Sequence, residues 1–298
     1  IVVFARDPAL GDVLWNIAGL LLGVAAASLP TVRHAAERVD VSPWLSPPVL
    51  IILSWLLVFA VPFVPAISPS EIWYSIKPLW EVRGWRLEPL LTSAAVWLAV
   101  GLLLQDVLGN RRVAVSLALM ALLGLSLLLP AVVAENALER GYVLGGLAGT
   151  ALWILLSYVL RLPAVWLNGL AVGLLIAVLI YRGLTPLEAR PVTGRFLWLP
   201  FAGALIGPLL QNIRAMLIKL TIYGAMLWLT RGQGRFTLLV WGALLALVSA
   251  IEVAQLYLWS GVPESTDPLL VVLIAIGIAL WERRKSQRAA EKKGDSAH

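Results

Sequence analysis

The stretch VAVSLALMALLGLSLLLPAVV, residues 113–133, decides the class of fold. It runs for 21 residues without a charged side chain, and a helix needs about 20 apolar residues to cross the hydrocarbon of a bilayer. The rest of the chain is similar: 60% of its 298 residues are hydrophobic and only 13% are charged. A soluble domain carries roughly a quarter charged residues. The sequence therefore predicts an all-α, polytopic integral membrane protein, a bundle of transmembrane helices.

Apolar stretches of this kind recur along the chain and predict about nine transmembrane helices. They cover residues 13–29, 48–66, 89–108, 113–133, 142–160, 164–181, 213–230, 236–258 and 268–282. Residues 196–210 are also apolar, but they are too short to span and contain Pro200 and Pro208. We predict a short re-entrant or interfacial segment there, with its backbone buried in protein.

The orientation follows from the basic residues and the tryptophans. Six basic residues crowd into the C-terminal tail: Arg283, Arg284, Lys285, Arg288, Lys292 and Lys293. Because cytoplasmic loops are rich in Lys and Arg, we expect a cytoplasmic C-terminus and place the links 67–88, 134–141, 182–212 and 259–267 outside. A basic run directly after an apolar helix indicates an anchor on anionic lipid rather than a nucleic-acid partner. Tryptophans near the predicted span ends are typical of an aromatic belt: Trp44, Trp73, Trp80, Trp85, Trp259 and Trp281.

The residue content excludes several kinds of chemistry. The chain has no cysteine and only two histidines, His34 and His298. Disulfides, thiolate nucleophiles and a histidine-based metal site are therefore excluded. The sequence also lacks the motifs of hydrolases, kinases and zinc enzymes. We predict no catalytic residue, no metal and no cofactor, although Glu252 taken alone could act as a base.

Ionisable side chains inside apolar spans are costly and point to function. Glu252 and Gln255 share one face of the span 236–258. They can hold a cation, a sugar hydroxyl or a head-group amine, or they can form an interhelical hydrogen-bond clamp; both interpretations stay open. Lys219 lies deeper in its span than Arg214 and is positioned to pair with Glu252 on the neighbouring antiparallel helix.

The N-terminal stretch carries a second polar pattern. Asp12 precedes an apolar run, where it can cap the first helix. Asn16, Gly19 and Gly23 follow on one stripe of that helix. Small residues at such spacing permit close helix packing, with Asn16 as a bridging hydrogen-bond partner.

Together these stretches resemble the VanZ-like membrane domain family. Its pattern is an apolar helix ending in Glu-x-x-Gln, a loop with an Arg, then an Asp followed by an Asn–Gly–Gly stripe. Residues 1–29 resemble the end of a first copy, with Arg6, Asp12, Asn16, Gly19 and Gly23; its Glu-x-x-Gln helix is expected before Ile1. Residues 195–282 resemble a second copy, with Lys219, Glu252, Gln255 and Asp267.

The second copy departs from the pattern after Asp267, where Val271, Ile274 and Ile278 replace the stripe. Residues 30–194 are connecting helices, and the echo of Leu14–Gly19 in Leu144–Gly149 suggests a degenerate middle repeat. Residues 283–298 form the basic tail.

The resemblance implies a bacterial cytoplasmic membrane protein of the cell envelope. The family is associated with low-level resistance to the antibiotic teicoplanin, and it offers no established catalytic residues. Three functions stay open: a non-enzymatic protein binding a lipid, a lipid-linked glycan or an amphiphilic drug at the outer leaflet; an accessory subunit of a larger membrane complex; and a transporter. The candidate binding residues are Glu252, Gln255, Asp267, Lys219, Arg6, Asp12 and Asn16, and the candidate helix-packing residues are Gly19 and Gly23.

Overall fold

The computed structural model describes residues 46–66, 68–80, 86–109, 111–133, 136–203, 208–232 and 234–295. Across these ranges the regular structure is helical, beside three isolated β-bridges, so the all-α prediction is confirmed. The α-helices are α3 (Pro47–Ala60), α4 (Pro69–Ile76), α5 (Leu87–Leu108), α6 (Arg112–Val132), α7 (Arg140–Ile154), α8 (Ala164–Leu184), α10 (Leu209–Leu229), α11 (Arg235–Gln255) and α12 (Thr266–Asp295). A 3-10 turn, Lys77–Leu79, follows α4, and a π-helical stretch, Leu155–Val159, continues α7.

Five of these helices are long and apolar enough to cross a membrane, which indicates a membrane protein. They are α5, α6, α7 with its continuation to Val159, α8, and α11 from Phe236 onward. They coincide with five of the nine predicted spans. Two other predicted spans fold as α10 and α12 but are not among the five. Arg214 and Lys219 lie within α10, and the uncharged run of α12 between Asp267 and Glu282 has only 14 residues. The predicted span 48–66 is shorter, since α3 has 14 residues, and the span 13–29 lies outside the described residues.

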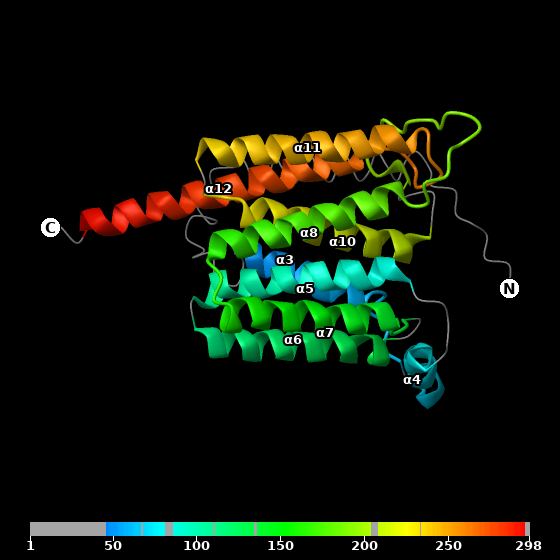
Figure 1. Cartoon of the computed structure of the whole chain (residues 1–298), viewed down its shortest axis with the longest axis horizontal. Coiled ribbons are helices and arrows are strands. Elements are labelled where there is room, and N and C mark those ends of the chain that lie inside the picture. The colour runs from blue at the N-terminus through cyan, green and yellow to red at the C-terminus, as the bar shows by residue number, and fades with distance from the viewer. Residues whose placement is uncertain are drawn as a thin grey trace, which may run out of the picture. The chain divides into compact units, whose positions relative to one another are not determined.

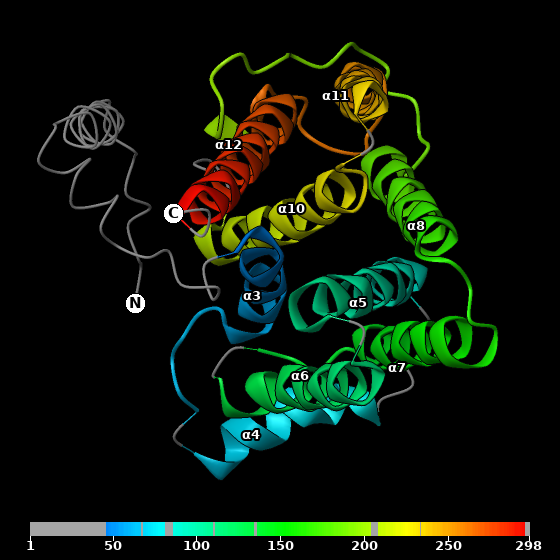
Figure 2. The same ribbon diagram turned by 90° about the vertical axis from the view of Figure 1, so that its left-hand side faces the viewer.

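The long helices run side by side, with their connections gathered at two ends (Figure 1). Helix α5 lies in the middle and packs against α3, α6, α7, α8 and α10, as the end-on view shows (Figure 2). About 72% of its apolar window is buried inside the protein, against 22–39% for the other four candidate spans. The protein core is therefore built around α5, and the remaining helices turn much of their apolar surface outward.

Helices α5 and α7 touch through their backbones because α7 presents glycines to α5. A Cβ atom added at Gly145 would lie 2.3 Å from the carbonyl oxygen of Leu90, and one at Gly149 would lie 2.3 Å from that of Ala94. The hydroxyl of Ser93 donates to the carbonyl of Tyr142 at 2.8 Å. These glycines belong to the stretch that echoes Leu14–Gly19, and their role here is close helix packing.

A cluster of charged and aromatic side chains joins three helices at one end of the bundle. At the end where α10 finishes, Asp106 accepts hydrogen bonds from the indole N–H of Trp228 at 2.6 Å and from the guanidinium of Arg231. Arg231 also pairs with Glu282 at 3.2 Å and lies 3.5 Å from the centroid of the Trp228 ring. This cluster ties α5, α10 and α12 together. A cavity lined by residues of α8, α10, α11 and α12 lies toward the opposite end.

Helix α12 continues well beyond its predicted span. The apolar part was expected to end at residue 282 and to pass into a basic tail. Instead the helix runs for 30 residues, to Asp295, and its C-terminal half projects from the bundle (Figure 1). The described side chains of this projection, Arg283 to Gln287, are exposed.

Helix α4 is short, contacts α6, and lies at the end opposite the projecting part of α12 (Figure 1). It begins with a capping box formed by Ser68 and Glu71. Its aromatic residues are solvent-accessible: Trp73 is 55% exposed, Tyr74 is 68% exposed, and Trp73 stacks on Trp80 with 6.0 Å between ring centroids. Exposed tryptophans beside helix ends suit the predicted aromatic belt.

Candidate functional site

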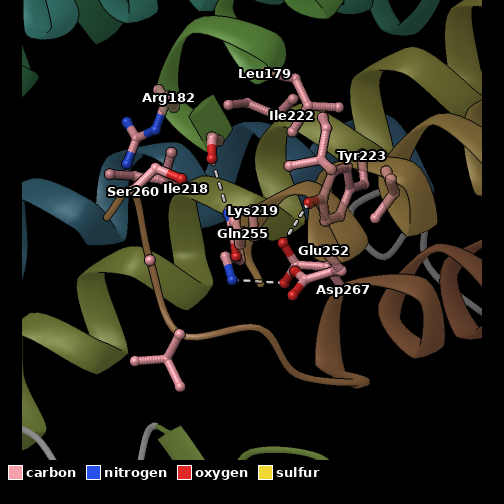
Figure 3. A pocket seen from close by; sticks show the side chains of 15 residues that line it. Leu179, Arg182, Ile218, Lys219, Ile222, Tyr223, Glu252, Gln255, Ser260 and Asp267 are labelled. Atoms are coloured by element: carbon pink, nitrogen blue, oxygen red, sulfur yellow. Dashed lines mark hydrogen bonds and ion pairs between the residues drawn. The ribbon is translucent and has the colours of Figure 1, made fainter. Parts of the chain in front are cut away.

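A cavity of about 210 Å³ lies where α8 and α11 end and α12 begins, with α10 forming its floor. Helix α8 packs on α10 and α11, and α12 packs on the same two helices, as the end-on view shows (Figure 2). Residues of all four helices line the cavity. The loop between α11 and α12 covers it with Ser260, Gly261 and Val262. One part of its wall is lined by polar side chains and the other part by apolar side chains (Figure 3).

Asp267, in the first turn of α12, organises the polar side. Its two carboxylate oxygens accept from the ammonium of Lys219 at 2.5 Å and from the hydroxyl of Tyr223 at 2.8 Å (Figure 3). Lys219 and Tyr223 stand four residues apart on α10, so they share one face. The N-terminal position in α12 also favours a negative charge. Asp267 is 8% exposed, and its charge is balanced by these partners.

Glu252 has a different partner from the one the sequence suggested. Its carboxylate accepts the backbone N–H of Glu264 at 2.7 Å, while Lys219 pairs with Asp267 instead. The side chain of Glu264 in turn accepts the backbone N–H of Gly203 at 3.0 Å. Glu252 is 4% exposed; it faces the protein interior and fixes the loop that covers the cavity.

Gln255 and Arg182 complete the polar wall. The amide of Gln255 donates to the carbonyl oxygen of Gly183 at 2.9 Å, which joins the end of α11 to the end of α8. Arg182 lines the cavity and forms an ion pair with Glu88 of α5 at 2.6 Å. The apolar wall is formed by aliphatic residues of α8, α10 and α11: Leu179, Ile218, Ile222, Val248 and Ile251.

Ser260 stands out among the lining residues. Its hydroxyl oxygen is buried and has no hydrogen-bond partner within the described part of the chain. Buried polar groups are nearly always paired, so an unpaired hydroxyl at a cavity wall is a position where a ligand group or a water can bind. Sequence reasoning missed Ser260, because a single serine in a loop carries no periodic signal.

The segment before α10 holds the covering loop in place. Arg190 donates to the carbonyl oxygens of Leu258 at 2.6 Å and Gly261 at 2.5 Å, and its guanidinium lies 4.9 Å from the Trp259 ring centroid. The backbone N–H of Leu197 donates to Pro263 at 2.9 Å. Within the predicted re-entrant segment, residues 196–203 are largely irregular and lie against this loop, and Leu209 and Leu210 begin α10; the depth of the segment in a membrane stays a prediction.

The structure brings together four predicted site residues from three helices: Lys219, Glu252, Gln255 and Asp267. The others lie outside the described residues: Arg6, Asp12, Asn16, Gly19 and Gly23. Tyr223 and Arg182 join the site without having been predicted as binding residues. The four-residue spacing from Lys219 was the available signal for Tyr223. Within the described ranges, no three His, Asp or Glu residues are grouped as metal ligands.

Comparison with known proteins adds no assignment. No protein-family model, no curated protein and no solved structure matches the chain. The likeness to VanZ-like domains therefore rests on the motifs quoted above, and the function has to be argued from the cavity itself.

Proposed function

We propose that this chain is a non-catalytic membrane protein that binds an amphiphile by its polar head in the cavity between α8, α10, α11 and α12. The amphiphile is a lipid, a lipid-linked glycan or an amphiphilic drug. The observation that carries the proposal is the unpaired, buried hydroxyl of Ser260 in a cavity with one charged and one aliphatic wall. Ligand sites combine an apolar lining with a few well-placed polar groups.

The lining chemistry suits recognition of a polar head. The cations of Lys219 and Arg182 match phosphate or carboxylate groups. The carboxylates of Glu252 and Asp267 match amines or hydroxyl groups, and the amide of Gln255 can take either side of a hydrogen bond. An amphiphile reaches such a site directly from the bilayer, because the cavity lies at the end of apolar helices.

The first experiment is native mass spectrometry of the full chain extracted in mild detergent. We expect a co-purifying amphiphile on the wild type. The Ser260→Trp variant fills the cavity and should lower its occupancy at least about tenfold, a loss of about 1.4 kcal/mol in binding free energy. Tyr257→Trp is the matched control, because that side chain lies in the same loop and is 58% exposed.

Two results would overturn the proposal: equal occupancy in Ser260→Trp and Tyr257→Trp, or a wild type that carries no amphiphile. A second protein chain bound in place of an amphiphile would instead favour the accessory-subunit alternative.

We further propose that the cavity faces the outer leaflet of a bacterial cytoplasmic membrane and that the C-terminus is cytoplasmic. The support comes from the basic residues after Trp281 and from the VanZ-like motifs. The finer topology of nine spans belongs to the same proposal, with α3, α10, α12 and residues 13–29 crossing or entering the membrane beside the five apolar helices.

Single cysteines test this orientation, since the chain has none of its own. Val262 is 56% exposed and lies in the covering loop, whereas Ser286 is exposed on the projecting part of α12. In intact cells, an impermeant thiol reagent should label the Val262→Cys variant and leave Ser286→Cys unlabelled until the membrane is permeabilised. Labelling of Ser286→Cys in intact cells would reverse the orientation.

A further inference from the structure

A second cavity, of about 190 Å³, lies between α8, α10 and α11. Its lining is aliphatic apart from one methionine and one threonine: Val172, Ile176, Met226, Thr230, Val240, Ala243, Leu244 and Leu247. The Thr230 hydroxyl donates to the Met226 carbonyl of its own helix at 2.8 Å and accepts from the Trp241 indole at 3.2 Å. The second cavity therefore offers a ligand almost purely apolar contacts.

The two cavities follow one another along α8, α10 and α11. On each helix the residues lining one cavity are about one turn from those lining the other. Ile176 stands three residues before Leu179 on α8, and Met226 stands four residues after Ile222 on α10. On α11, Leu247 and Val248 line different cavities although they are neighbours. One turn is about 5.4 Å, so the two sets of lining residues adjoin each other along the three helices.

Their combined dimensions match one leaflet. From Val172 to Gly183 on α8 the lining spans 12 residues, or about 16 Å of helix. That is about half of the roughly 30 Å hydrocarbon thickness of a bilayer. Together the two volumes enter the range of about 300–1,000 Å³ typical of small-molecule sites, which neither reaches alone.

We propose that these cavities form one site for a single-chain amphiphile with a zwitterionic head, its apolar chain lying in the second cavity. This inference rests on the proposed function and names the ligand class. The head is zwitterionic because both cations on the wall are already paired, Lys219 with Asp267 at 2.5 Å and Arg182 with Glu88 at 2.6 Å, while the Glu252 carboxylate accepts a backbone N–H. A head with one sign of charge would draw one partner away and leave the other uncompensated, which is costly in a buried site. A head that carries both an anion and a cation can pair with both partners of the ion pair at once, so no charge is left uncompensated.

Lysophosphatidylethanolamine is the probe, since it joins one acyl chain to a phosphate and an ammonium. Its binding to the full chain in detergent is measured by native mass spectrometry for a long and a short acyl chain. We expect the long chain to bind at least about tenfold more tightly than the short one. Ala243→Trp, which fills the second cavity from α11, should remove this difference. Ala246→Trp, an exposed position on the same helix outside both lining sets, should retain it.

The possible outcomes are distinguishable. A wild type that binds neither probe overturns this inference alone, whereas the proposed function is overturned only by the co-purification experiment described above. If Ser260→Trp abolishes binding but the wild type binds the long and the short acyl chain equally well, the site for the head is supported. The placement of the acyl chain in the second cavity is then overturned. The same holds if Ala243→Trp keeps the dependence. Equally tight binding of lysophosphatidylglycerol, whose head is anionic, overturns the zwitterionic assignment.

Discussion

Replacing Gly149 with leucine should lower the free energy of unfolding by about 3 kcal/mol or more. Overpacking a core usually costs about 1–3 kcal/mol, and here the obstacle is backbone. A Cβ atom would lie 2.3 Å from the carbonyl oxygen of Ala94 and 3.0 Å from its Cα, so no side-chain rotation relieves the overlap. Helices α5 and α7 would have to move apart, and α5 also packs against four other helices.

Gly173→Leu on α8 is the matched control. A Cβ atom there meets nothing within 4 Å, and removing a glycine from a helix interior gains up to about 1 kcal/mol in helix propensity. Thermal unfolding of the purified protein in detergent should show a large fall for Gly149→Leu and no fall for Gly173→Leu. Similar melting temperatures for the two variants would show that the contact between α5 and α7 is not as close as described.

Replacing Asp267 with asparagine should lower the free energy of unfolding by about 2–4 kcal/mol. The amide oxygen can still accept from Tyr223, but it no longer neutralises Lys219. The cost stays below that of a fully buried pair, because the Lys219 side chain is 34% exposed and can turn toward the cavity, whereas the side chain of Asp267 is only 11% exposed.

A double-mutant cycle separates this pairing from a general loss of packing. Lys219→Met alone leaves the more buried carboxylate uncompensated and should cost a comparable amount. Lys219→Met combined with Asp267→Asn should recover most of the loss, because no unpaired charge remains. Lys285→Met, at an exposed position on α12, is the control and should change little. Strictly additive losses at the two positions would contradict the ion pair.

The apolar helices were predictable because physical constraints leave few alternatives. Some 20 apolar residues without charge fold as a helix in lipid, and the positions of α5, α6, α7, α8 and α11 follow from that. The predicted length of α3 was wrong. The apolar stretch continues through Pro62 and Pro65, but proline disrupts helix hydrogen bonding, so the helix ends before them. The tail was interpreted by its charge, although its Ala, Glu, Lys, Arg and Gln residues are good helix formers.

The site was predictable in its residues but not in its contacts. Glu252 and Lys219 drew attention because charge is costly in apolar spans, and both line the same cavity. The sequence could not decide between Glu252 and Asp267 as the partner of Lys219, because the answer depends on how the loop after α11 folds back. Glu264 and Ser260 belong to that loop and have no periodic pattern that would reveal them.

The length of α12 changes what its basic residues can do. At 30 residues it is about 45 Å long, while the hydrocarbon layer is only about 30 Å thick. The exposed basic residues Arg283, Arg284 and Lys285 lie two to four residues beyond Trp281, or at most about 6 Å further along the helix. Electrostatic attraction at physiological ionic strength is screened over about 8 Å. For a helix standing upright in the bilayer with Trp281 at the interface, these three charges therefore lie within range of the lipid head groups, while the helix backbone continues for a further ten residues, to Asp295, into the aqueous phase.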